Sequence, residues 1–231
     1  METEIRRLSF GLGFVNCYLI RQEGLILVDA GISSKAKGIL KRLKDWSIEP
    51  EDISLIFVTH GHLDHIGSLA ELKDLTGCQI AVNMHEKDWL EQGLNPLPPG
   101  ATTWGKIMSI FNRIFTPFVK IVPAPVDLTL DDREFSLEPY GIHGKVIYTP
   151  GHSPGSMSLL LDTGDAFVGD LAVNGLPLRI GPGMPIFAED VAALKESWRL
   201  ILDSGARQIY PGHGKPFAAE ELHKALLKEI G

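Results

Sequence analysis

Cysteine is scarce in this chain of 231 residues, which contains only Cys17 and Cys78. Both lie in apolar surroundings without the spacing of a thiolate metal site or a redox pair, so buried small side chains are the simpler interpretation. Long hydrophobic runs are also missing, since no segment approaches the ~18 uninterrupted apolar residues of a membrane-spanning helix. The first residues lack a basic stretch followed by an apolar core, so no signal peptide is expected. The sequence therefore predicts a cytoplasmic protein without stable membrane insertion.

Positive charge is in deficit, because 22 Lys and Arg stand against 29 Asp and Glu, for a formal net charge of −7. Phosphate backbones are bound by basic surfaces, so this balance argues against a nucleic acid as a partner. With 44% hydrophobic and 22% charged residues, the composition is that of an ordinary globular protein. The length suffices for one sizeable core without a division into two domains. We therefore expect a single domain over residues 1–231.

Histidine and aspartate are concentrated in one short stretch directly after the apolar run 53–58. This stretch reads His60-Gly-His62-Leu-Asp64-His65, so three of the eight histidines fall within six residues. His60 and His62 are two residues apart, so both point the same way in an extended segment. Asp64 and His65 follow where the chain must turn, and they can face a second point nearby. Imidazole and carboxylate are ligands for zinc, iron or manganese, so this stretch predicts a metal site.

Three further segments place the same residue types after predicted strands. They contain His152, Asp170 and His213. Residues 56–62 resemble residues 146–152, a weak internal similarity that suggests two related half-domains, each presenting ligands from a loop at a strand end. Ligand sites in α/β folds gather at such edges, so we expect these side chains to converge at one edge.

Taken together, these segments resemble the metal motifs of the metallo-β-lactamase superfamily, more specifically its glyoxalase II-like hydrolases. The resemblance covers nearly the whole chain and implies an α/β fold, a four-layer αββα sandwich of two mixed sheets flanked by helices. It also implies two divalent metal ions, zinc before iron or manganese. It assigns one metal to His60, His62 and His152, the other to Asp64, His65 and His213, and makes Asp170 the bridge between them.

The chemistry that this resemblance implies is hydrolysis by a water or hydroxide held between the two metals. Metal coordination lowers the pKa of water from about 15.7 toward about 7, which gives a nucleophile at neutral pH. Asp64 would also accept a proton during turnover, as a catalytic residue. Many β-lactamases of the superfamily have a cysteine or another ligand set where this chain has Asp170, so β-lactam hydrolysis is not expected.

Asp29 ends the strand predicted over residues 25–28. An acid at this place can orient a ligand histidine through a hydrogen bond, and the family resemblance supports that role. The alternative is an aspartate that only forms the turn. After the metal motif, the helical spacing over residues 66–75 predicts one helix that begins at Asp64-His65 and ends at Gly77.

Residues 94–125 depart from the alternation of strands and helices. A Pro-rich approach is followed by helical spacing with a broad apolar face, broken at Pro117. We expect a helical insertion that covers the active site and binds the apolar acyl part of a small-molecule substrate. The alternatives are a helix packed flat on the core, a basic amphipathic segment touching a membrane surface, and a dimer surface, since the sequence leaves a homodimer open. The face comprises Trp104, Ile107, Met108, Ile110, Phe111, Ile114, Phe115, Phe118 and Val119.

The leading functional hypothesis is a hydrolase of esters, thioesters or lactones with a dinuclear metal centre. An enzyme of another class, an iron-dependent oxygenase that acts on persulfides, resembles these hydrolases but uses one iron. A phosphodiesterase or nuclease is the third hypothesis. The number and identity of the metals, together with the class of substrate, separate the three.

Overall fold

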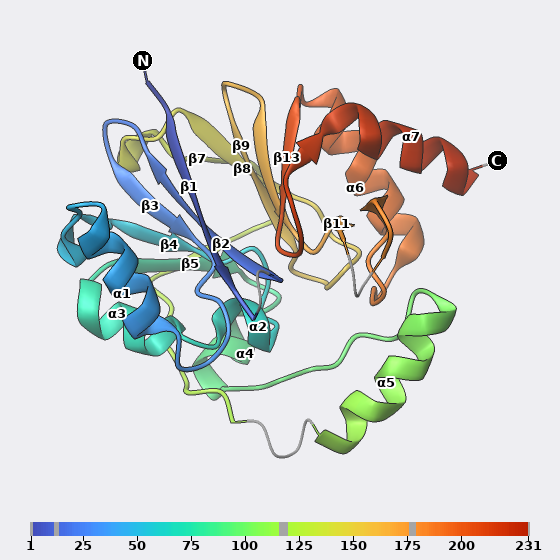
Figure 1. Ribbon diagram of the computed structural model, residues 1–231, viewed down its shortest axis with the longest axis horizontal. Helices are drawn as coiled ribbons and strands as arrows, with labels where there is room; N and C mark the ends of the chain where they lie inside the picture. Colours follow the sequence, from blue (N-terminus) through green and yellow to red (C-terminus); the bar gives the residue numbers. More distant parts are fainter. Residues whose placement is uncertain (1, 12–13, 116–119, 176–178, 231) are drawn as a thin grey trace.

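Two six-stranded sheets form the centre of the fold in the computed structural model, which describes residues 2–11, 14–115, 120–175 and 179–230 (Figure 1). The first has the order β1 (Glu4–Phe10), β2 (Val15–Arg21), β3 (Leu25–Val28), β4 (Leu55–Phe57), β5 (Gln79–Asn83) and β6 (Leu128–Leu130). The second has the order β14 (Phe217–Ala218), β13 (Gln208–Pro211), β10 (Asp165–Gly169), β9 (Met157–Leu161), β8 (Gly144–Tyr148) and β7 (Phe135–Ser136). Strands β3 to β6 pair in parallel, as do β10 and β13, and the other neighbours are antiparallel. Both sheets are therefore mixed.

Helices cover the outer face of each sheet, and hydrophobic side chains fill the three spaces between the layers. Helices α1 (Ala36–Asp45) and α3 (Leu69–Thr76) pack on the first sheet, and α6 (Val191–Asp203) and α7 (Ala219–Ile230) on the second (Figure 1). Between the sheets, Phe57 and Phe167 belong to one fully buried cluster. Each central strand is apolar on both faces because each faces a core on both sides. The predicted four-layer αββα sandwich is confirmed.

Helix α6 illustrates how the sequence defines a covering layer. It begins after Asp190, whose side chain accepts hydrogen bonds from the backbone N–H groups of Ala192 and Ala193. Leu194, Trp198 and Ile201 are spaced by four and three residues and are fully buried on the sheet. The helix thus has one capped end and one apolar face.

The single helix predicted after the metal motif is two helices, so that prediction is wrong at its centre. Helix α2 (Leu63–Ile66) ends at Gly67, and α3 starts at Leu69. The Gly67 N–H donates to the Gly31 carbonyl at 2.8 Å, and the Ser68 hydroxyl donates to the Ile32 carbonyl at 2.7 Å. These bonds to the loop after β3 replace helical bonds and hold α2 in place.

Four short elements join these layers. Helix α4 (Lys87–Gln92) follows β5. The two-residue strands β11 (Val173–Asn174) and β12 (Pro182–Gly183) pair with each other, and β14 is equally short. Two-residue strands carry no periodicity, so the pattern of apolar residues cannot reveal them.

The segment 94–125 carries helix α5 (Thr103–Phe115), which Figure 1 shows set apart from the sandwich. The residues just before this helix are bonded to the segment that precedes α6, since the Ala101 N–H donates to the Ile186 carbonyl at 2.8 Å. Trp104, Ile107 and Ile110 are 49%, 45% and 64% exposed, which argues against a helix packed flat on the core at these positions. The side chains of Phe111, Ile114 and Phe115, and residues Pro117, Phe118 and Val119, lie outside the described part of the chain.

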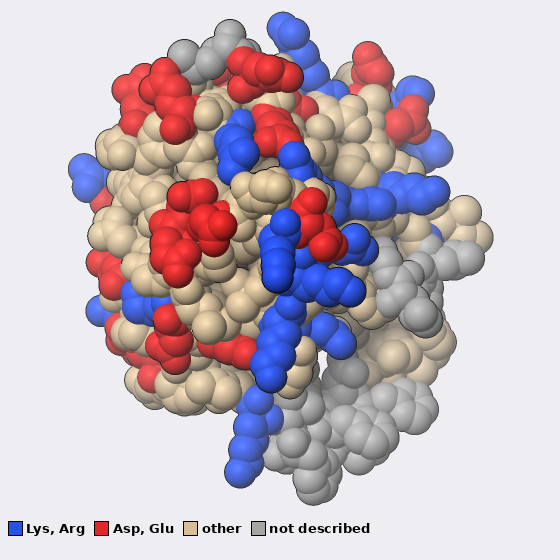
Figure 2. All heavy atoms as spheres, turned by 60° about the vertical axis from the view of Figure 1, so that its left-hand side comes forward, with Lys and Arg blue, Asp and Glu red and all other residues tan. Residues whose placement is uncertain are grey.

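The charge on the surface is unevenly distributed. Figure 2 shows Lys and Arg side chains gathered in a band on one face, although the formal net charge is −7. Helix α1 alone exposes four basic side chains, those of Lys37, Lys41, Arg42 and Lys44. Among the residues that the structure describes, no helix has the length and apolar character needed to cross a membrane.

Candidate metal centre

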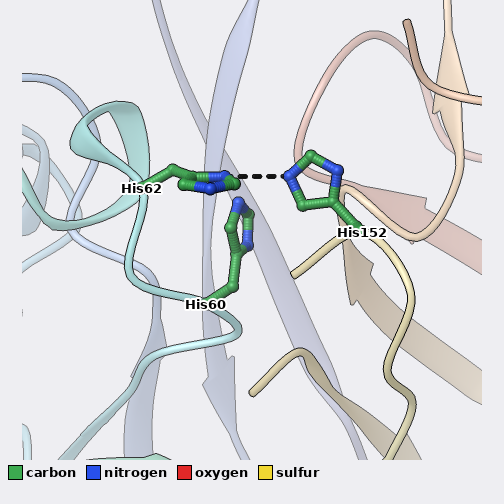
Figure 3. A group of neighbouring side chains, drawn as sticks. All are labelled: His60, His62 and His152. Atoms are coloured by element: carbon green, nitrogen blue, oxygen red, sulfur yellow. Dashed lines mark hydrogen bonds between the residues drawn. The ribbon is translucent and has the colours of Figure 1, made fainter. Parts of the chain in front are cut away.

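The seven side chains expected to bind metal all lie directly after strands or in the helix that follows one. The set comprises His60 and His62 after β4, Asp64 and His65 in α2, His152 after β8, Asp170 after β10, and His213 after β13. Both sheets contribute, so the loops meet between the two halves of the sandwich. In Figure 3, His60 and His62 extend from one loop toward His152 on the other. The expected convergence is therefore present.

The two triads assigned from the family resemblance are both compact. One ligand atom from each of His60, His62 and His152 lies within 4.8 Å of the other two, and the same holds for Asp64, His65 and His213. His62 Nδ1 and His152 Nε2 are 2.9 Å apart (Figure 3). The imidazole centroids of His60 and His65 are 4.1 Å apart, so the two triads are adjacent.

Asp170 faces histidines of both triads. Its Oδ2 lies 3.7 Å from His152 Nε2 and 3.3 Å from His213 Nε2. Its Oδ1 lies 3.4 Å from His65 Nε2. A carboxylate with one set of histidines on either side has the position that a bridging ligand requires.

Four of the five histidines have Nδ1 held by a neighbouring oxygen. The partners are Thr59 Oγ1 for His60 at 3.1 Å, Asp29 Oδ2 for His65 at 2.8 Å, the Phe187 carbonyl for His152 at 2.9 Å, and the Phe14 carbonyl for His213 at 3.2 Å. The contact expected from Asp29 is present. Such partners set the ring orientation and direct Nε2 toward a metal. The two carbonyl partners were not predicted, because a backbone carbonyl leaves no signal in the sequence.

Several atoms that point into this cluster are buried without a hydrogen-bond partner among the described residues. They are Nε2 of His60, His62 and His65, and Oδ1 of Asp170. A buried polar atom without a partner costs about 1–3 kcal/mol, so native proteins rarely leave several together. Imidazole nitrogens and a carboxylate are the donors that zinc, iron and manganese accept. The residues present therefore fit a metal centre.

The electrostatics of the two triads differ. Burial, and then repulsion by neighbouring imidazoles, lowers the pKa of His60 and brings the pKa of His62 to about 3, so both are neutral. Burial also lowers the pKa of His213, but Asp170 and Asp64 outweigh it and raise that pKa to about 10. Without metal, the first triad thus offers lone pairs, and the second holds an ion pair that a metal would replace.

Residues 151–155 also fit the pattern G-x-S-x-G, which in serine hydrolases presents an exposed nucleophile on a strand-to-helix turn. Here Ser153 is fully buried, and its hydroxyl lies 2.6 Å from that of Ser156. The neighbouring His152 points into the metal cluster. A serine nucleophile is therefore not available at this place.

Comparison with known proteins places the chain in a family. The Metallo-beta-lactamase superfamily matches over residues 10–213. The chain is 27% identical over 173 residues to the probable metallo-hydrolase YqgX of Bacillus subtilis (strain 168), covering 74% of this chain and 72% of that protein. It is 28% identical over 208 residues to the probable metallo-hydrolase MJ0888 of Methanocaldococcus jannaschii, covering 87% of each.

A solved structure shares the fold. The BLEG-1 B3 metallo-beta-lactamase superposes with a TM-score of 0.70 at 22% identity, covering 94% of this chain and 95% of that one. At this identity, the likeness speaks for the architecture alone. The family match extends over most of the sequence and includes all seven clustered side chains. The chain belongs to the metallo-β-lactamase superfamily.

Proposed function

We propose that this chain is a glyoxalase II-like hydrolase that uses two metal ions to cleave an ester, thioester or lactone. Zinc is the metal that we expect at both positions. The observation that carries the proposal is the pair of compact ligand triads with Asp170 between them. When bound, two divalent ions lower the pKa of water toward about 7 and polarise a substrate carbonyl. The names of the two probable metallo-hydrolases support hydrolysis without indicating the substrate.

Within this centre, Asp64 is the residue we propose as proton acceptor. Its side chain is 36% exposed, whereas those of His213 and Asp170 are 4% and 11% exposed. A proton acceptor must pass its proton on to solvent, and of these three side chains only this carboxylate has substantial exposure. Asp64 Oδ2 also lies 3.0 Å from His213 Nε2, which keeps the carboxylate directed at the centre.

The substrate that fits best is a small molecule with an apolar acyl part. Trp104, Ile107 and Ile110 expose a row of apolar surface on α5, at a spacing of three residues. The start of this helix is tied to the segment around Phe187, whose carbonyl contacts His152. We propose that the insertion 94–125 covers the centre and contributes the acyl pocket.

Metal analysis coupled to a substrate panel tests this proposal. Two zinc ions per chain, with turnover of lactones or acyl thioesters, is the expected result. Substitution of His60 by Ala should mainly empty one site, and substitution of His213 by Ala the other, so metal stoichiometry follows the two triads variant by variant. One iron per chain, with oxygen uptake when persulfides are added, would instead identify the chain as an iron-dependent oxygenase.

A phosphodiesterase is the second candidate, and the basic band in Figure 2 is the observation that favours it. A surface of Lys and Arg can bind a polyanionic substrate even on a chain of negative net charge. Turnover of bis-p-nitrophenyl phosphate and RNA checks this. Replacing Lys41 and Arg42, two exposed basic side chains of α1, by Ala should weaken RNA binding and its salt dependence if the basic side chains of this helix bind phosphate.

A further inference from the structure

Glu86 is a fully buried acid that none of the metal motifs contains. It lies just before α4 and reaches across to two separate loops. Its Oε2 accepts a hydrogen bond from the Gly61 N–H at 2.5 Å, and its Oε1 accepts one from the Gly155 N–H at 2.8 Å. One carboxylate therefore joins the loop of His60 and His62 to the loop of His152.

Both bonds are made to a residue of a ligand-bearing loop. Gly61 is the residue between His60 and His62, and Gly155 is three residues after His152. The three histidines of these loops make up one complete triad. The distance between the loops, and with it the shape of the triad, depends on a side chain that contacts both.

The packing around Glu86 leaves little freedom for this contact to change. A Cβ atom on Gly155 would lie 2.7 Å from Glu86 Cγ and 2.9 Å from its Cδ, so only glycine admits the carboxylate at this distance. From α4, the helix that follows Glu86, the Trp89 ring stacks on the ring of His62 with centroids 6.0 Å apart.

From this geometry we infer that Glu86 is a positioning residue for the metal site of His60, His62 and His152. Two backbone donors from different loops need two acceptor atoms at a fixed spacing, and a carboxylate supplies both. Since both of these bonds are to backbone N–H groups and not to the histidine side chains, it acts on the triad through the loops. The inference rests on the proposed metal centre but not on the identity of the substrate.

The test measures zinc affinity by competition with a chromophoric chelator, in wild-type protein and in Glu86→Gln. The amide keeps the size but has one acceptor, so its NH₂ group must face one of the two backbone N–H groups. Outer partners of metal ligands typically contribute 10–100-fold in affinity, and we expect a loss of that size at one of two sites. Wild-type affinity at both sites would overturn the inference.

A second variant keeps the experiment decisive if Glu86→Gln does not fold. Gly155→Ala retains the carboxylate but pushes it away from the His152 loop, so it should weaken the same site. The matched control is Asp127→Asn, because Asp127 also accepts a backbone N–H, that of Ile80 at 2.8 Å, and pairs with Lys73 away from the metal motifs.

The control should lower the melting temperature of the metal-free protein and leave zinc affinity unchanged. If Gly155→Ala binds zinc like wild type, or the control loses as much affinity as Glu86→Gln, the role of Glu86 is only structural. Wild-type protein that binds zinc but cleaves nothing in the substrate panel would overturn the proposed hydrolysis and leave the role of Glu86 intact.

Discussion

Asp29 offers the sharpest test of how the chain orients a metal ligand. Its Oδ1 accepts the Thr59 N–H at 2.8 Å, and its Oδ2 accepts the Thr59 hydroxyl at 2.9 Å and His65 Nδ1 at 2.8 Å. With the proton on Nδ1, the lone pair of His65 is on Nε2, which faces the centre. The change Asp29→Asn alters this arrangement without altering its size.

The orientation of the new amide is imposed by Thr59. Because the Thr59 N–H requires an acceptor, the amide oxygen must take the place of Oδ1, and the NH₂ group must face His65 Nδ1. That nitrogen then accepts a hydrogen bond, so the proton of a neutral imidazole moves to Nε2 and blocks the ligand atom. We expect a 10–100-fold loss of zinc affinity, about 1.4–2.8 kcal/mol.

Backbone strain does not contribute to the loss of zinc affinity expected for Asp29→Asn. Asp29 has φ of 62°, a left-handed conformation that asparagine tolerates well and alanine does not. The lost charge-assisted bonds should lower the free energy of unfolding by about 1–3 kcal/mol, which a thermal melt of the metal-free protein measures separately. Chelator competition gives the affinity.

The matched control is Asp132→Asn, the same change at an exposed Asp–His pair outside the centre, where His85 Nε2 lies 3.4 Å away. It should leave zinc affinity unchanged. If Asp29→Asn binds zinc as tightly as wild type, Asp29 only forms the turn after β3, and the tautomer argument is refuted.

The remaining predictions concern the other parts of the site. Asp170→Ala should lower metal content and abolish hydrolysis, because one carboxylate faces both triads; retention of two metals with full activity would exclude the bridge. Without metal, Asp170 and Asp64 raise the pKa of His213 to about 10, so zinc binding should release protons and zinc affinity should rise toward pH 10. Calorimetry in buffers of different ionisation enthalpy counts the released protons. In the metal-free protein, the raised pKa of His213 stabilises the fold fully below about pH 6.5, and this contribution is lost as the pH rises through about 10. Thermal melts at a series of pH values between these limits measure the loss. Ile110→Ser should change the free energy of unfolding by less than about 0.5 kcal/mol, because the side chain is 64% exposed. The same variant should weaken turnover of long-chain substrates more than that of short-chain substrates. An unchanged chain-length preference would show that α5 does not line the substrate pocket.

The layers and the convergence of the seven clustered side chains could be predicted because both follow simple patterns. Apolar runs such as 53–58 require burial on both faces, and the ligands follow them in each sheet. The break at Gly67 could not be predicted, because it depends on bonds to Gly31 and Ile32, residues more than thirty positions away. The homodimer, the cytoplasmic location and the covering role of the insertion stay predictions.

The hydrogen-bond partners of the proposed ligands were harder to predict than the clustering of the proposed ligands themselves. Asp29 was expected from its place at a strand end, and the structure supplies the contact. Glu86 reads in the sequence as the first residue of a short helix, with no spacing that relates it to Gly61 or Gly155. Its role depends on the approach of three loops, which is a property of the tertiary fold alone.

The contacts around Phe187 link the insertion to the metal centre. The Ala188 N–H donates to the Pro99 carbonyl at 3.1 Å, and Gly100 pairs with Phe187 as an isolated bridge. Phe187 in turn accepts the hydrogen bond of His152 Nδ1, so the approach to α5 holds the group that orients a proposed ligand. A change in the insertion that disturbs this pairing should therefore alter metal binding as well as substrate preference. We therefore expect substrate range and metal geometry to be coupled through the Phe187 carbonyl.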